Sequence, residues 1–173
     1  MKGRPEPSEA ASYYFTYIDQ VKGDEPFESI NNQLEMYLPF LKGISEEQSR
    51  HRYAADKWSI RQVLNHITDT ERAFAFRALW FARKFDEPLP GFDQEIAAAG
   101  ANADAISWAA HVEEFTHVRL ATISLFQNLP ADAWMRTGVA SGYTFSVRAL
   151  AFIIPGHVEH HVRILRERYV KAE

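Results

Sequence analysis

Apolar residues recur at helical spacing in four stretches of the chain, residues 26–41, 60–84, 105–128 and 147–169. In each stretch the apolar side chains stand three or four positions apart, so they share one face of a helix. No stretch shows the two-residue alternation that is typical of a half-buried strand. The pattern therefore predicts an all-α protein, and four amphipathic helices suit a four-helix bundle.

Residues that favour helix ends bound these stretches. Ser59 and Gln62 have the spacing of a capping box, and Trp58 is placed to pack over the start of that helix. Within the fourth stretch, Pro155 and Gly156 fall in mid-helix, and the missing amide of the proline predicts a kink there. The other expected N-caps are Asp24, Asn102 or Asp104, and Ser146.

Proline and glycine separate the helices into an uneven set of connections. Residues 85–104 are long enough for a crossover over the end of the bundle, with a short helical turn in the alanine-rich part at 97–101. Residues 130–145 are expected to form a loop. The aromatic residues near the N-terminus indicate an extension, residues 1–24, that packs on a bundle domain formed by residues 25–171.

Length and composition narrow the functional classes. The chain has 173 residues, 46% of them hydrophobic, which suits one domain with a substantial core. A net charge of −4 and the lack of a basic run argue against nucleic-acid binding. With no cysteine, disulfides, thiolate metal sites and a cysteine nucleophile are excluded. No signal-peptide pattern and no apolar run of roughly 20 residues are present, so we expect a cytoplasmic protein without a membrane partner.

Two of the seven histidines stand one helical turn apart in the last stretch. On a wheel of about 100° per residue, His161 lies about 30° and His157 about 70° from the centre of the apolar stripe. His160 lies about 130° away, towards solvent. The inward pair needs polar partners, which a metal ion, backbone carbonyls or carboxylates could each supply.

A mononuclear metal site with three protein ligands and an open position needs one more histidine. His66, on the edge of the inward face of the second helix, is the best candidate, and His111 is the runner-up. His117 projects to the polar side of the third helix, and His51 falls in a loop.

Glu71 lies in the middle of the apolar face of the second helix, an unusual place for a carboxylate. We expect it to pair with an inward arginine such as Arg148, or to support the site as a partner of a metal ligand. A ferritin-like di-iron site is set aside, because only Glu114 and His117 have the required Glu-x-x-His spacing. The chain also lacks HExxH, GxSxG, GxGxxG and P-loop motifs.

Two segments together resemble the DinB/YfiT-like family. Trp58-Ser59, His66 and Glu71-Arg72 are similar to its second helix, and the segment from Gly156 to Arg163 is similar to its fourth, which typically ends in His-x-x-His-His. The resemblance covers roughly residues 25–170 and implies a four-helix bundle with an unusual connection order. It also implies a divalent metal, nickel or zinc, held between helices by His66, His157 and His161. Pro155 and Gly156 depart from many relatives.

The family includes thiol-S-transferases that use low-molecular-weight thiols, mycothiol-dependent isomerases and members described as metal-dependent hydrolases. The resemblance therefore implies a thiol-S-transferase or hydrolase acting on a small-molecule substrate, with a low-molecular-weight thiol as one possible co-substrate. The reacting group would be a water or a thiol at the metal, with Glu71 as a supporting residue. The alternative is a non-enzymatic metal- or ligand-binding stress-response bundle protein, and a homodimer stays open. A pocket of about 300 Å³ or more at the metal would favour the enzyme.

Overall fold

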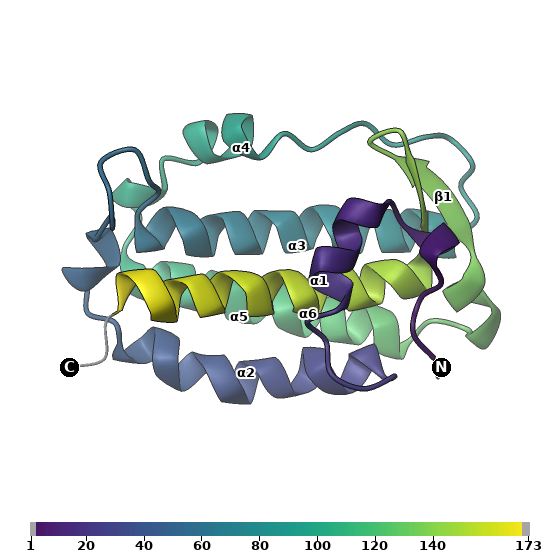
Figure 1. The fold of residues 1–173 in the computed structure, drawn as a ribbon, viewed down its shortest axis with the longest axis horizontal. Coiled ribbons are helices and arrows are strands. Elements are labelled where there is room, and N and C mark those ends of the chain that lie inside the picture. Colours follow the sequence, from purple (N-terminus) through teal and green to yellow (C-terminus); the bar gives the residue numbers. More distant parts are fainter. Residues whose placement is uncertain (1–2, 171–173) are drawn as a thin grey trace.

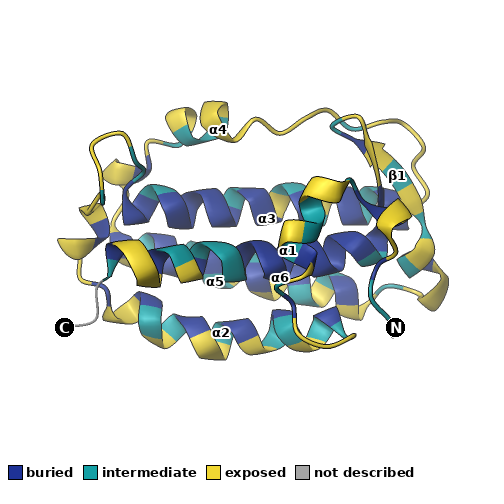
Figure 2. Ribbon diagram, in the orientation of Figure 1, coloured by how far each residue is buried: buried dark blue, intermediate teal, exposed yellow. Residues whose placement is uncertain are grey.

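The computed structural model describes residues 3–170, which form a helical bundle (Figure 1). Four long helices lie side by side: α2 (Pro26–Gly43), α3 (Ile60–Ala82), α5 (Trp108–Gln127) and α6 (Val147–Ile164). Buried residues gather on the faces that these helices turn towards one another (Figure 2). The predicted fold class is confirmed, with boundaries within a few residues of those expected.

Shorter elements join the long helices. Among the described residues they are the helices α1 (Phe15–Ile18) and α4 (Gln94–Ala101), the 3-10 turns η1 (Pro7–Glu9), η2 (Ser12–Tyr14), η3 (Gln48–Arg50), η4 (Ala103–Ala105) and η5 (Ala131–Met135), the π-helical turn η6 (Leu165–Tyr169), and the strands β1 (Thr137–Ala140) and β2 (Tyr143–Ser146). No helix in residues 3–170 is long and apolar enough to cross a membrane.

The connection between α3 and α5 gives the bundle its unusual order. The chain leaves the end of α3, returns along the outside of that helix through α4, and starts α5 at the end where α3 also starts (Figure 1). Helices α3 and α5 are therefore parallel. The predicted long crossover connection is confirmed, but it runs along the side of α3 rather than over the end of the bundle, because twenty-odd residues are enough to span the length of a 23-residue helix.

Side-chain caps fix the starts of the helices that carry the candidate site. Ser59 Oγ accepts from Gln62 N at 3.1 Å, and Gln62 Oε1 accepts from Ser59 N at 3.0 Å, which completes the predicted capping box. Ser146 caps α6 as expected, accepting from Ala149 N at 2.9 Å. These caps set the phase with which each helix presents its histidines.

The other two expected caps were wrong. Ser107 caps α5, accepting from Ala110 N at 3.3 Å, while Asp104 accepts hydrogen bonds from Ser59 and Arg52 instead. Helix α2 starts after Glu25 rather than Asp24. At the start of α5, these contacts engage Asp104 and leave Ser107 to cap the helix.

A β-hairpin closes one end of the bundle, where the sequence predicted only a loop. Strands β1 and β2 pair antiparallel through a two-residue turn, in which Ser141 has φ 54° and Gly142 has φ 80°. A Cβ on Gly138 would lie 2.0 Å from the Phe81 ring, so only glycine lets β1 approach α3 this closely. Strands of four residues are too short for a visible alternation, and the Ser-Gly turn was the available signal.

In the described part of the N-terminal segment, α1 packs across α6 (Figure 1). Arg4 donates to the carbonyl oxygens of Ile18 and Val21 at 2.7 and 2.8 Å. Where α1 crosses α6, a Cβ on Gly156 would lie 2.0 Å from the carbonyl oxygen of Tyr17. Gly156 therefore permits the contact, and α6 continues without interruption through Pro155.

The buried apolar side chains form two clusters, one towards the hairpin and one towards the C-terminal end of α6. Along each long helix, at least one buried polar residue stands between positions that belong to the two clusters. These residues include Gln33 on α2, Glu71 on α3, Arg119 on α5 and His157 on α6. The bundle thus contains a polar layer near its middle, and the candidate site adjoins it.

Candidate metal centre

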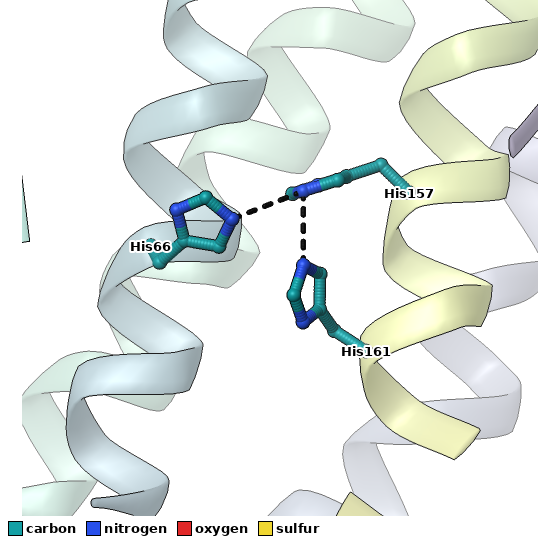
Figure 3. A group of neighbouring side chains, drawn as sticks. All are labelled: His66, His157 and His161. Carbon is teal, nitrogen blue, oxygen red and sulfur yellow. Dashed lines mark hydrogen bonds between the residues drawn. The ribbon is translucent and has the colours of Figure 1, made fainter. Parts of the chain in front are cut away.

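Three imidazole rings meet between α3 and α6 (Figure 3). His157 Nε2 lies 3.1 Å from Nε2 of His66 and 3.1 Å from Nε2 of His161. One ring nitrogen from each histidine lies within 4.8 Å of the other two. The structure therefore brings together the three residues that the sequence proposed, while their role as metal ligands stays a prediction.

Thr70 positions the ring of His66 from one turn further along α3. Its Oγ1 lies 3.3 Å from His66 Nδ1. When Nδ1 carries the proton and donates to this hydroxyl, the lone pair of Nε2 points at the other two histidines. The Trp58 ring packs on the same imidazole, with ring centroids 5.0 Å apart, and limits its rotation.

Burial keeps the three imidazoles neutral. Removal from water lowers the pKa of His66 to about 4 and, with the nearby His66 and His160, lowers the pKa of His161 to about 3. The pKa of His157 falls well below its ordinary value, first through burial and then through the neighbouring histidines and Arg119. Neutral imidazole is the form that binds a metal ion.

The donor set fits a divalent ion of the zinc type. Two nitrogens at the usual metal distance and a tetrahedral angle are about 3.3 Å apart, close to the two observed separations of 3.1 Å. His157 Nε2 faces two other ring nitrogens but offers a single hydrogen or a single lone pair, so hydrogen bonding alone satisfies it poorly. The cluster contains no carboxylate, so an ion held there would keep its full charge.

The remaining histidines of the sequence lie elsewhere. His160, rejected by the helical wheel, stands outside the cluster, and its Nδ1 is 3.5 Å from Gln20 Nε2. The runner-up His111 is buried on α5 and its Nε2 lies 2.9 Å from the Ala103 carbonyl oxygen. His117 is exposed, and the His51 ring packs against Tyr169.

Glu71 is buried, and its partner is Arg119 rather than Arg148. Arg119 donates to Glu71 Oε2 through Nη2 at 2.7 Å and Nε at 3.2 Å, and to Gln33 Oε1 at 2.8 Å. Arg148 instead pairs with Glu9 of the N-terminal segment. The expectation of Arg148 was wrong because the crossover places α5, not the first turn of α6, opposite Glu71. Glu71 Oε1 has no hydrogen-bond partner among the described residues.

A cleft of about 100 Å³ borders His66 and His157. Its walls come from the N-terminal segment, α3, the crossover, the hairpin and α6, and include Tyr14, Tyr17, Thr70, Arg77, Phe92 and Ser141. The cleft is smaller than the 300 Å³ that would favour an enzyme outright. A larger cavity of about 490 Å³ lies beside His117 and Trp108, away from the histidine cluster.

Most of the residues that line this cleft were not predicted from the sequence. His66, Thr70 and Arg77 stand at positions i, i+4 and i+11 of α3, a spacing that places them on one face, so Thr70 and Arg77 could have been proposed. Tyr17 could not, because nothing in the sequence places the N-terminal segment over α6. Its ring packs edge-on against His157 with centroids 5.2 Å apart.

Fold and site together define a helical bundle with parallel α3 and α5 and a three-histidine cluster between α3 and α6. Residues 30–165 match the DinB superfamily, and the chain belongs to this family. No curated protein sequence matches the chain.

The solved structures that are similar to the chain include the following two. YfiT from Bacillus subtilis, described as a probable metal-dependent hydrolase with an unusual four-helix bundle topology, has a TM-score of 0.67 and 12% identity over 94% of this chain and 90% of its own. A mycothiol-dependent maleylpyruvate isomerase has a TM-score of 0.65 and 13% identity over 79% of this chain and 58% of its own. At such identities the likeness establishes the shared fold alone.

Proposed function

We propose that His66, His157 and His161 bind one divalent metal ion, nickel or zinc, and that the protein is a metal-dependent enzyme acting on a small molecule. The observation that carries this proposal is the convergence of three neutral imidazoles, those of the buried His66 and His157 at the wall of a cleft and that of the half-buried His161 beside them. If the cluster were purely structural, hydrogen bonds would hold it poorly, because His157 Nε2 faces two other ring nitrogens and can form a hydrogen bond with only one of them. The donor spacing supports the proposal as well.

Different residues of the chain would have different roles at such a metal site. The three histidines would hold the ion and leave a position facing the cleft, and Thr70 would keep the His66 nitrogen directed at it. An ion there would supply Lewis acidity and lower the pKa of a water or thiol that reached it. Trp58 and Tyr17 pack on His66 and His157 and restrict the access of bulk water.

Two reactions fit this arrangement, hydrolysis and thiol-S-transfer. The description of YfiT as a probable metal-dependent hydrolase supports the first, and the mycothiol dependence of the isomerase supports the use of a thiol. The chain has no cysteine, so a thiol would have to enter as a co-substrate. A low-molecular-weight thiol is our candidate for that role.

The second candidate function is a non-enzymatic bundle that binds a metal or a small ligand. The cleft volume of about 100 Å³ favours it, because enzymes that enclose a small molecule usually offer a larger pocket. We also propose that residues 25–171 form the bundle domain and residues 1–24 an extension that packs on it, that the protein is cytoplasmic, and that it can form a homodimer.

The test is metal analysis of protein purified without an affinity tag, followed by thiol-conjugation and ester-hydrolysis screens on the metal-loaded form. The proposal predicts about one divalent ion per chain and turnover that disappears when a chelator removes it. Bound metal without turnover in either screen would favour the non-enzymatic alternative. Turnover in stringently metal-free protein would contradict the proposed mechanism.

A further inference from the structure

Arg77 lies in the same cleft as His66 and His157, nearer the hairpin. Its side chain is 5% exposed, yet it lines the cleft wall. Its Nη2 donates to Ser141 Oγ at 2.9 Å, and its guanidinium carbon stands 5.5 Å from the Phe74 ring centroid and 5.9 Å from that of Phe145. These contacts hold the side chain in place without neutralising its charge.

The other buried arginines of the described chain have carboxylate partners. Arg61 pairs with Glu46, and Arg119 pairs with Glu71. Arg77 makes no ion pair within residues 3–170. A buried guanidinium without a counter-ion is costly, so its place at a cleft wall calls for an anion from outside the chain.

The electrostatics of the cleft support an anion there. Burial lowers the pKa of Arg77, although the Tyr14 phenol beside it partly offsets this, and a guanidinium still remains protonated at neutral pH. Among the described residues, the wall of the cleft contains no aspartate or glutamate, so an entering anion meets no like charge on it. The planar guanidinium matches a carboxylate with two parallel hydrogen bonds.

The position of Arg77 sets the length of the molecule it would bind. Eleven residues at about 1.5 Å each place the Cα atoms of His66 and Arg77 roughly 16 Å apart along α3. Side chains on a helix lean towards its N-terminus, which brings the guanidinium closer to the histidines than this rise. A ligand that spans both must be elongated rather than compact.

We infer that Arg77 binds a carboxylate at one end of an elongated small molecule whose other end reaches the three-histidine centre. This inference rests on the proposed function, because it takes the histidine cluster to be the reacting end. It adds the substrate class: an anionic molecule, recognised by its carboxylate at the hairpin end of the cleft.

The inference can be tested by calorimetric binding to the zinc-loaded protein. The probes are mercaptoalkanoates of increasing chain length, and each has a control, the mercaptoalkanol of the same length, which carries the same thiol without the charge. We expect one chain length at which the carboxylate binds about tenfold or more tightly than the alcohol, since hydrogen bonds to charged groups contribute about 1.5–3 kcal/mol.

Variants assign that preference to Arg77. Arg77→Met should remove the preference for the carboxylate and leave the affinity for the alcohol within about twofold, whereas Arg77→Lys should retain part of it. Arg72→Met is the matched control, because Arg72 lies on the exposed face of the same helix and pairs with Asp69 and Glu114; it should keep the full preference. Thermal melting and metal content check that each variant is folded and loaded.

The outcomes separate this inference from the proposed function. Equal affinity of both probes at every length in the unsubstituted protein would overturn the role of Arg77 and leave the metal site standing. An unchanged preference in Arg77→Met would overturn it as well. If neither thiol binds the zinc-loaded protein, the open metal position is contradicted, and the proposed function and the inference both fall.

Discussion

Gly156 is the position at which the N-terminal segment and α6 meet most closely, and its replacement by alanine tests that contact. The new Cβ would lie 2.0 Å from the Tyr17 carbonyl oxygen and 2.5 Å from the carbonyl carbon. Both atoms belong to the backbone, so no side-chain rotation can relieve the overlap. Either α1 moves away from α6, or α6 itself shifts and displaces His157.

Two opposing terms set the size of the effect. Alanine in a helix interior is favoured over glycine by about 1 kcal/mol. Forcing an extra methyl into a packed contact costs about 1–3 kcal/mol. Gly100 provides the matched control, because it is also helical and a Cβ there would meet nothing within 4 Å. Gly100→Ala should thus gain the helix propensity of alanine without a steric cost. The free energy of unfolding of Gly156→Ala should be about 2 kcal/mol lower than that of Gly100→Ala.

Thermal melting of the two variants measures this difference. For a domain of this size 1 kcal/mol shifts Tm by about 2–4 °C, so Gly156→Ala should melt about 4–8 °C below Gly100→Ala. The environment of Tyr17 should also change in near-ultraviolet circular dichroism, because its ring packs on His157. Equal stabilisation by both substitutions would refute the close approach of Tyr17 to α6.

Three further predictions concern the rest of the chain. Glu71→Gln should lower the free energy of unfolding in urea by about 3 kcal/mol, because it leaves Arg119 buried without a charge partner, and adding Arg119→Met should recover part of the loss. Burial would raise the pKa of Glu9, but hydrogen bonds and the charge of Arg148 outweigh it and lower that pKa below 4.5. The stabilisation by Glu9 is therefore present above about pH 4.5 and lost as the pH falls through the lowered value, so Glu9→Gln should destabilise the protein at pH 7 and have a shrinking effect in acid. A chain limited to residues 25–171 should keep its far-ultraviolet helical signal and melt at a lower temperature; loss of the helical signal would contradict the proposed domain division.

Local signals in the sequence were enough to predict the four long helices. Ser59 with Gln62, and Ser146, mark helix starts that the structure confirms, because a cap depends on residues within one turn. The path of residues 85–104 and the β-hairpin escaped prediction because both depend on contacts between distant segments. Position 138 is an example: it must be glycine because a Cβ there would overlap the ring of Phe81, more than fifty residues earlier.

In the candidate site too, features that depend on one helix were predicted, and features that depend on contacts between helices were not. The helical wheel selected His157 and His161 and rejected His160, because the face of a helix is a local property. The partner of Glu71 was missed because it depends on which helix lies opposite, and connection order is not encoded within one helix. Arg77 stood on the right face of α3, but its missing counter-ion becomes visible only when the surrounding carboxylates have been located.

The metal content of two neighbouring variants is the sharpest test of the proposed metal ligands. His161 belongs to the three-histidine cluster and His160, the next residue back on α6, does not. We expect His160→Ala to retain about one divalent ion per chain after gel filtration. His161→Ala should retain almost none and still show a cooperative melt, because the apolar clusters of the bundle do not need the ion. Equal loss of metal from both variants, or full retention by His161→Ala, would contradict the assignment of the ligands.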